Sequence, residues 1–300
     1  MSRTSTASSS PGNRRGVAPG VPERPEEVRA ALRRLGVVPS RGLGQSFLVD
    51  RFAADALAAL AEPGADRPVY EIGGGLGLVT QALVGRGVRE LTVVERDRRL
   101  ARHLAATFGP AVRVLVADAR DVAFPSDATV VGSLPFSSGT AIVLRLLARR
   151  VVRLAALLQK EVAERFAAEP GGRAYGRPTI VARYYGVPEL LREVPASAFY
   201  PEPRVSARLW SHTARAGPLP LATPDRLEEV VRRLFAQRRK QLGNLLPRLR
   251  VGDRTAAELA HAASWPDDWA RRRPEELPPE AYVRLAGVLE ADPRRPSARP

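Results

Sequence analysis

Apolar runs and helical patterns alternate through the first half of the chain. The apolar runs cover residues 69–72, 90–95, 112–117 and 129–131, and the helical patterns between and after them cover 78–86, 98–108 and 140–149. Short strand-like runs that alternate with helices of this length predict a parallel sheet with helices on both faces. We therefore predict an α/β fold with a doubly wound, Rossmann-like sheet.

The rest of the chain extends this pattern at both ends. It predicts a helix over 26–35, a glycine-bearing loop over 40–50 and a helix over 51–61; later come a strand over 153–158, helices over 161–168 and 178–185, and strands over 188–194 and 205–210. The last part is helical only, over 224–246, 256–262 and 279–289. We predict an α/β domain over 25–213 and a small helical domain over 214–291. Residues 1–24 and 292–300 have too little apolar surface to offset the entropy of ordering, and we expect them to be disordered.

Composition narrows the class of protein. The chain has 300 residues, 44% of them hydrophobic, which is enough for a substantial core. No apolar run approaches the ~18 residues that a membrane span needs, and the first residues lack the apolar core of a secretory signal, so we expect a cytoplasmic protein. Without cysteine the chain has no disulfide, thiolate zinc site or cysteine nucleophile, and its three histidines are scattered, so we predict no metal.

The charge points to an anionic partner. The net charge is +15, and for a soluble protein nucleic acid is the first candidate for such an excess. Lys160 and Lys240 are the only lysines, so compositional bias explains the preference for arginine, although it does not explain the excess over acids. The chain has no heptad pattern, and we expect a monomer.

Glycines break the first strand of the predicted sheet into the following helix. The stretch is Glu71-Ile-Gly-Gly-Gly-Leu-Gly77, and glycines at such a turn let a ligand approach the backbone, with helix N–H groups facing it. Glu95 and Asp118 end the next two strands, at the edge where such sheets bind ligands. These carboxylates suit adenosine, because one can accept both ribose hydroxyls and the other an exocyclic amine.

The same stretch lacks the Gly-Lys-Ser/Thr ending of a phosphate-binding loop. A glycine turn with two acids therefore favours S-adenosylmethionine over ATP. The alternatives are a glycine turn of purely steric origin and carboxylates that only cap helices or contact solvent.

The fourth strand ends in Ser133-Leu-Pro-Phe136. An aromatic side chain held by a proline turn at a strand end can stack on a base, and carbonyl groups of the turn can accept hydrogen bonds from an exocyclic amine. An adenine amine is a poor nucleophile because its lone pair is delocalised into the ring. Two acceptors on its N–H groups favour the pyramidal form that attacks a methyl group. The alternative is an ordinary proline turn with a core phenylalanine.

Together with motifs elsewhere, these stretches resemble the small-subunit (16S-type) rRNA adenine N6,N6-dimethyltransferases, which are related to the large-subunit rRNA adenine methyltransferases. The matching motifs lie in family order over residues 40–246: Gly44-Gln-Ser-Phe-Leu48, Glu71-Ile-Gly-Gly-Gly-Leu-Gly77, Val94-Glu-Arg-Asp97, Asp118-Ala119, Ser133-Leu-Pro-Phe136, Leu158-Gln-Lys-Glu-Val162, Tyr175-Gly-Arg177, Ser197-Ala-Phe-Tyr-Pro-Glu-Pro-Arg-Val205 and Phe235-Ala-Gln-Arg-Arg-Lys240. The Gln-Lys-Glu-Val and Tyr-Gly-Arg stretches are closer to the small-subunit enzymes.

The resemblance implies a function and three groups of site residues. It implies dimethylation of adjacent adenosines near the 3′ end of small-subunit rRNA, with S-adenosylmethionine as cofactor and a small ribosomal subunit precursor as partner. The implied cofactor-binding residues are Gln45, Ser46, Leu48, Gly73, Gly75, Glu95, Arg96, Asp118, Ala119 and Ser133. The implied catalytic residues are Ser133, Leu134, Pro135, Phe136 and Phe199, with both phenylalanines stacking on a flipped adenine. The implied RNA-binding residues are Lys160, Arg177, Arg204, Arg238, Arg239 and Lys240.

The chain departs from the family pattern at two serines. The family usually has Asn at the positions of Ser46 and Ser133, and at the second position the Asn side chain is the acceptor for the target amine. A serine hydroxyl accepts a hydrogen bond but reaches less far. Three hypotheses follow: an active dimethyltransferase, which we favour, a slower or single-methyl enzyme, and a catalytically weak RNA-binding ribosome assembly factor. Methylation of large-subunit rRNA, which confers antibiotic resistance, is the rival within the enzyme class.

Overall fold

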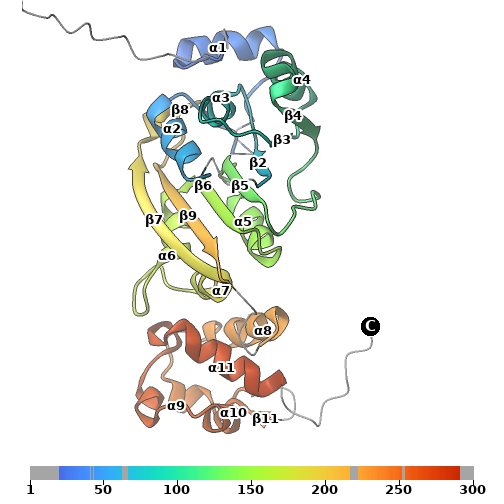
Figure 1. Cartoon of the computed structure of the whole chain (residues 1–300). Helices are drawn as coiled ribbons and strands as arrows, with labels where there is room; N and C mark the ends of the chain where they lie inside the picture. The colour runs from blue at the N-terminus through green and yellow to red at the C-terminus, as the bar shows by residue number, and fades with distance from the viewer. Residues whose placement is uncertain are drawn as a thin grey trace, which may run out of the picture.

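The computed structural model describes residues 20–40, 42, 44–62, 67–216, 222–251 and 254–290. A seven-stranded sheet with helices on both faces forms one end of the molecule, and the C-terminal helices gather beyond α7 at the other end (Figure 1). Residues 1–19 and 292–300 of our predicted tails lie outside the described residues, whereas residues 20–24 are described and Glu23 pairs with Arg51. No helix in the described part of the chain is both long enough and apolar enough to cross a bilayer.

The seven strands lie in the order β4-β3-β2-β5-β6-β9-β7. Their bounds are β2 Val69–Ile72, β3 Leu91–Glu95, β4 Arg113–Val116, β5 Thr129–Ser133, β6 Arg153–Gln159, β7 Gly186–Val194 and β9 Ala207–Ala214. Strands β4, β3, β2, β5 and β6 run parallel to one another, and β9 is antiparallel to both of its neighbours, β6 and β7. The predicted α/β sheet is confirmed, and its order reverses between β2 and β5, which is where such sheets form a ligand crevice.

Helices cover both faces of this sheet because its central strands are apolar on both sides. Val130 and Val131 are neighbours on β5, are both fully buried, and belong to opposite cores. Such continuous apolar runs are typical of a strand covered on both faces. The helices on the two faces are α2 Arg51–Ala59, α3 Leu78–Gly85 and α4 Arg98–Phe108 on one, and α5 Gly139–Ala148, α6 Lys160–Ala167 and α7 Arg177–Tyr185 on the other.

Strand β5 is longer than the apolar run that predicted it. It continues through Gly132 to Ser133. A Cβ atom on Gly132 would lie 2.7 Å from the carbonyl oxygen of Ile72 on β2, so only glycine fits this close approach between strands. Our prediction ended the strand at Val131, whereas a glycine inside a strand can also mark a close approach of another backbone. The consequence is that Ser133 is held in the sheet itself.

A second small sheet joins two distant motifs. Strand β1, Phe47–Leu48, pairs antiparallel with β8, Phe199–Tyr200, in the register Phe47↔Tyr200 and Leu48↔Phe199. Helix α1, Pro25–Arg34, packs its buried Val28 and Leu32 into the same cluster as Phe47. The predicted loop over 40–50 is therefore anchored beside the aromatic residues of the 197–203 segment.

The C-terminal part consists of α8 Pro224–Phe235, α9 Leu242–Leu245, α10 Ala256–Ala262, α11 Pro279–Glu290 and a two-stranded ribbon of β10 Arg250–Val251 and β11 Arg254–Thr255. Our single helix over 224–246 is wrong: the chain turns after Phe235, and the N–H of Leu242 donates to the carbonyl of Arg272 at 2.8 Å. Tertiary contact thus starts a new helix there. Buried residues of α8 and α11 continue the core that lies beneath α7.

Candidate active site

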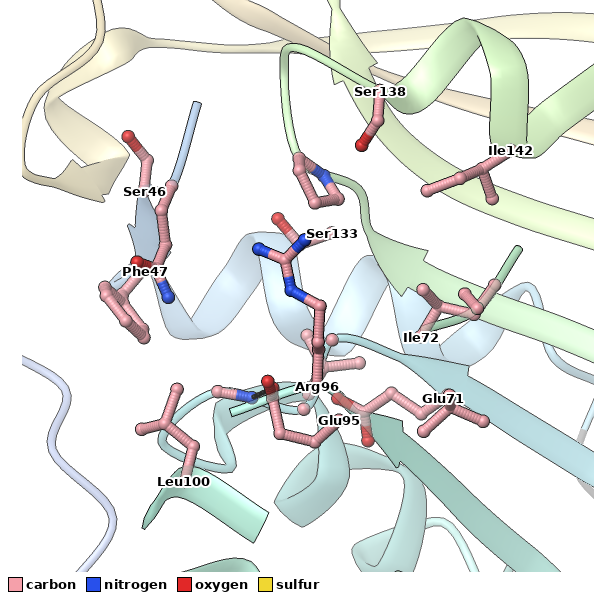
Figure 2. Close-up of a pocket in the computed structure, with 18 of the residues that line it drawn as sticks. Ser46, Phe47, Glu71, Ile72, Glu95, Arg96, Leu100, Ser133, Ser138 and Ile142 are labelled. Atoms are coloured by element: carbon pink, nitrogen blue, oxygen red, sulfur yellow. Dashed lines mark hydrogen bonds between the residues drawn. The ribbon is translucent and has the colours of Figure 1, made fainter. Parts of the chain in front are cut away.

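A cavity of about 380 Å³ opens at the carboxyl ends of β2, β3 and β5, at the reversal of strand order (Figure 2). All ten residues that the resemblance implied for the cofactor line it, namely Gln45, Ser46, Leu48, Gly73, Gly75, Glu95, Arg96, Asp118, Ala119 and Ser133. Residues that we did not single out complete the wall, among them Glu71, Arg120 and Ile142. Glu71 and Arg120 stand inside or beside the motifs already noted, so motif position alone could have indicated them.

The glycine turn exposes its backbone to this cavity. Gly73 has φ +75°, a conformation that side chains disfavour, and the only atom within 4 Å of a Cβ built there is the carbonyl oxygen of Ser133, at 3.9 Å. The position is therefore open space rather than a packing contact. Gly74 shows the opposite case, because its Cβ would lie 2.4 Å from Val93 Cγ1. One glycine lets the strand pack, and its neighbour leaves room for a ligand against the backbone.

Glu95 is fixed at the tip of β3 by backbone donors. Its Oε2 accepts from the N–H of Gly75 at 3.1 Å, and its Oε1 accepts from the N–H of Asp97 at 2.9 Å. Burial raises the pKa of Glu95, and these N–H groups oppose that rise. Each carboxylate oxygen has more than one acceptor site, so an oriented Glu95 can still accept the two hydroxyls of a ribose.

Asp118 faces two arginines. Its Oδ1 accepts from Arg120 Nε at 3.0 Å and from the Arg120 N–H at 2.9 Å, while its Oδ2 accepts from Arg120 Nη2 at 2.8 Å. Arg96 Nη1 lies 3.8 Å from the same Oδ2. The hydrogen bonds from Arg120 lower the pKa of Asp118 to about 2. Asp118 is therefore a carboxylate at neutral pH and can accept from an exocyclic amine.

Glu71 is the most buried carboxyl of the cavity wall. Its side chain is 1% exposed and accepts a hydrogen bond from Thr80 Oγ1 at 2.6 Å. Burial raises its pKa to about 7 against that hydrogen bond. Glu71 thus exchanges a proton near neutral pH beneath the glycine turn.

The Ser133–Phe136 segment is held from two sides. The N–H of Leu134 donates to the Leu157 carbonyl at 3.2 Å, and the N–H of Phe136 donates to the Gly44 carbonyl at 3.3 Å. Ser133 and Pro135 line the cavity, whereas the Leu134 side chain is buried in the core. Of the implied catalytic set, Leu134 could therefore contribute only its backbone to a ligand.

Phe136 and Phe199 meet although 63 positions separate them in the chain. Their ring centroids are 5.9 Å apart with an interplanar angle of 64°, an edge-to-face arrangement. The pairing of β1 with β8 brings Phe199 here, because Leu48 is its register partner and Gly44 bonds to Phe136. Neither ring lines the cofactor cavity: Phe136 is half-buried next to the Ser133 loop, and Phe199 is buried behind it at 2% exposed.

Ser46 tethers two of the motifs. Its Oγ donates to the carbonyl of Pro201 at 2.8 Å, and Figure 2 shows the hydroxyl turned away from Ser133. Gln45 Oε1 accepts from the N–H of Ser40 at 3.2 Å. Both residues therefore shape the wall of the cavity through contacts within the protein.

The implied RNA-binding residues are not all in one place. Arg177, Arg238 and Arg239 line a second cavity between α6, α7 and the C-terminal part, while Lys160, Arg204 and Lys240 do not line it. Three further arginines of this cavity, Arg165, Arg173 and Arg273, were not in our set. Ion pairs with acids hold Lys160, Arg177 and Arg238, at 2.9 Å from Glu193, 2.5 Å from Glu228 and 2.6 Å from Glu275. Arg239 and Lys240 are exposed and have no ion pair among the described residues.

Comparisons with known proteins identify the family of this chain. A family model described as "Ribosomal RNA adenine dimethylase" matches residues 40–266. The "Ribosomal RNA small subunit methyltransferase A" of Myxococcus xanthus is 36% identical over 275 residues, covering 88% of this chain and 95% of that protein. The protein of the same name from Geobacillus thermodenitrificans is 34% identical, covering 88% of this chain and 96% of that protein.

Two solved structures have similar folds. A dimethyladenosine transferase from Plasmodium falciparum superposes with a TM-score of 0.69 at 19% identity, covering 80% of this chain and 95% of that one. The 23S rRNA methyltransferase ErmE superposes with a TM-score of 0.63 at 27% identity, covering 81% and 99%. Both matches extend well beyond the strands that frame the cavity.

Proposed function

The chain belongs to the ribosomal RNA adenine dimethylase family, and we propose that it transfers methyl groups from S-adenosylmethionine to the N6 atoms of adjacent adenosines near the 3′ end of small-subunit rRNA. The observation that carries this proposal is the cavity at the reversal of strand order, which ends at Ser133 beside the Phe136–Phe199 pair. The names of the relatives from Myxococcus xanthus and Geobacillus thermodenitrificans support the small subunit as the substrate.

The cavity fits an adenosine-bearing cofactor. Glu95 is aimed by two backbone donors and accepts the ribose hydroxyls, while the ionised Asp118 accepts the purine amine. The open face of Gly73 leaves space for the rest of the molecule against the backbone. When bound, S-adenosylmethionine supplies the electrophilic methyl group. The protein's own contribution is to orient the cofactor toward Ser133.

In this proposal the acceptor adenine lies between the Ser133–Phe136 turn and the Phe136–Phe199 pair. Ser133 Oγ and a carbonyl of the turn accept from the N6 amine and so favour its pyramidal, nucleophilic form. Phe136 and Phe199 hold the ring by stacking, which helps to offset the few kcal/mol lost on unstacking the base (about 1–3 kcal/mol per stacked base). A hydroxyl is shorter than an amide side chain, so Ser133 is the residue on which the rate and the number of methyl groups depend.

The RNA contacts come from the basic residues outside this cavity. Arg239 and Lys240 are exposed, and with Arg177 and Arg238 nearby they supply positive charge for RNA phosphates. We further propose that the protein acts as a monomer in the cytoplasm, on a precursor of the small ribosomal subunit. A second candidate substrate is large-subunit rRNA, because the 23S rRNA methyltransferase ErmE shares 27% of its sequence and the fold.

A methyl-transfer assay tests the proposal. Small-subunit particles that lack the modification are incubated with labelled S-adenosylmethionine and either the wild type or Ser133→Asn, and the product nucleosides are separated. We expect dimethyladenosine from the wild type and a faster second methylation from Ser133→Asn. Product only from Ser133→Asn would indicate an assembly factor on a weakened enzyme scaffold. Product only from 23S rRNA, run in parallel, would favour the second candidate.

A further inference from the structure

Two arginines stand at the purine end of the cavity, one beside each strand-tip acid. Arg96 directly follows Glu95, and Arg120 lies two positions after Asp118. Both line the cavity, and both side chains are 55% exposed. Figure 2 shows the Arg96 side chain extending from the end of β3 into the cavity, above Glu95. The methyl-donor cavity therefore contains two cations to which the proposed function gives no specific role.

The two guanidinium groups are held very differently. Arg120 makes a two-point contact with Asp118, through Nε at 3.0 Å and Nη2 at 2.8 Å. The guanidinium of Arg96 makes no hydrogen bond with the described residues, and its single ion pair, with Asp118, is 3.8 Å long. Arg120 is consequently fixed in the plane of the carboxylate, whereas Arg96 can turn at little cost, because exposed ion pairs of this length contribute little.

The position of Arg96 decides what it can reach. Its backbone is adjacent to Glu95, the ribose acceptor, and its guanidinium is close to Asp118, the acceptor for the purine amine. A purine whose ribose is bound by Glu95 and whose amine is bound by Asp118 would be within reach of this guanidinium. A planar guanidinium over an aromatic face is attracted by the π-electrons and stacks on the ring, which a more strongly hydrated ammonium does less well.

We propose that the two arginines divide recognition of the cofactor's base: Arg96 stacks on the face of the purine, and Arg120 positions Asp118 to accept the exocyclic amine. This inference rests on the proposed function, because it assumes an adenosine-bearing cofactor. It specifies that Arg96 contributes affinity for any purine in the cavity. Arg120 contributes the preference for adenine over a purine that carries an oxo group at the same position.

Calorimetric titration of the full chain with S-adenosylhomocysteine and S-inosylhomocysteine separates these roles. Arg96→Ala should weaken both ligands by the same factor, about fivefold. Arg96→Lys should recover only part of that loss. Arg120→Ala should instead reduce the preference for S-adenosylhomocysteine over S-inosylhomocysteine. Thermal unfolding without ligand serves as the control for folding. Both side chains are half exposed, so neither substitution should change the unfolding temperature much.

Any other result would contradict the role proposed for Arg96 or the role proposed for Arg120. Unchanged affinities in Arg96→Ala, or full recovery in Arg96→Lys, would overturn the stacking assignment. Tighter binding of S-adenosylmethionine with unchanged S-adenosylhomocysteine binding in Arg96→Ala would mean that the cation opposes the sulfonium charge. An unchanged ligand preference in Arg120→Ala would overturn its positioning role. Failure of the folded wild type to bind S-adenosylhomocysteine at all would instead refute the cofactor assignment of the proposed function.

Discussion

Replacing Glu71 with glutamine should stabilise the protein above neutral pH. The Glu71 carboxyl is 1% exposed beneath the glycine turn, and its one hydrogen bond from a side chain comes from Thr80 Oγ1 at 2.6 Å. Burial raises its pKa to about 7, against a usual value of 4.5. A glutamine has nearly the same shape, and its side-chain oxygen can accept the same hydrogen bond. The substitution thus removes the buried charge while leaving the packing in place.

The sign and size of this effect on the free energy of unfolding follow from the pKa of Glu71 in the folded and unfolded states. The folded state binds the Glu71 proton more tightly than the unfolded state, so the contribution of this group to stability is greatest below the unfolded pKa and falls as the pH rises toward the folded pKa. The interval of about 2.5 pH units, at about 1.4 kcal/mol per unit, corresponds to about 3 kcal/mol at pH 8. The wild type therefore loses this amount relative to Glu71→Gln between pH 4.5 and pH 8.

Urea unfolding of both proteins at several pH values measures this difference. We expect nearly equal free energies of unfolding near pH 4, below the unfolded pKa, and an advantage of about 3 kcal/mol for Glu71→Gln at pH 8. Glu90→Gln, at an exposed position just before β3, is the matched control and should follow the wild type at every pH. A constant difference between Glu71→Gln and the wild type across the range would refute the assignment of a buried carboxyl that ionises near neutrality.

Three further predictions address function. Glu95→Ala should lower the affinity for S-adenosylhomocysteine at least tenfold with little change in thermal stability, and unchanged calorimetric binding would count against the ribose assignment. Phe136→Ala should slow methyl transfer about tenfold while leaving cofactor affinity intact, because the ring contacts Phe199 outside the cofactor cavity; parallel losses in both measurements would place the ring at the cofactor instead. Joint alanine substitution of Arg239 and Lys240 should reduce the slope of log affinity for RNA against log salt by about 1–2, and an unaltered slope would exclude these residues as phosphate contacts.

Much of the α/β fold was determined by the sequence alone. The runs at 69–72 and 90–95 predicted their strands nearly to the residue, because a strand buried on both faces is mostly apolar. The acids Glu95 and Asp118 could be placed at one edge, since parallel strands end together. The net charge of +15 likewise indicated an anionic partner without reference to any fold.

Other features depended on contacts between distant segments. Local pattern could not show that β1 pairs with β8, and that pairing is what brings Phe199 to Phe136. It predicted one helix where α8 and α9 form two, because the break is set by a hydrogen bond from Leu242 to Arg272.

For the side chains at the cavity, too, the sequence predicted some properties and only the tertiary structure showed the others. The sequence indicated Arg96 but not Arg120 as a cavity residue, and only the structure shows that the Arg120 side chain is held by two hydrogen bonds while the Arg96 guanidinium is nearly free. It places Glu71 in a glycine motif, but only burial beneath the turn gives that carboxyl a pKa of about 7. Periodicity and residue type determine which elements form, whereas the distances, burial and charge states that set the chemistry arise when those elements pack.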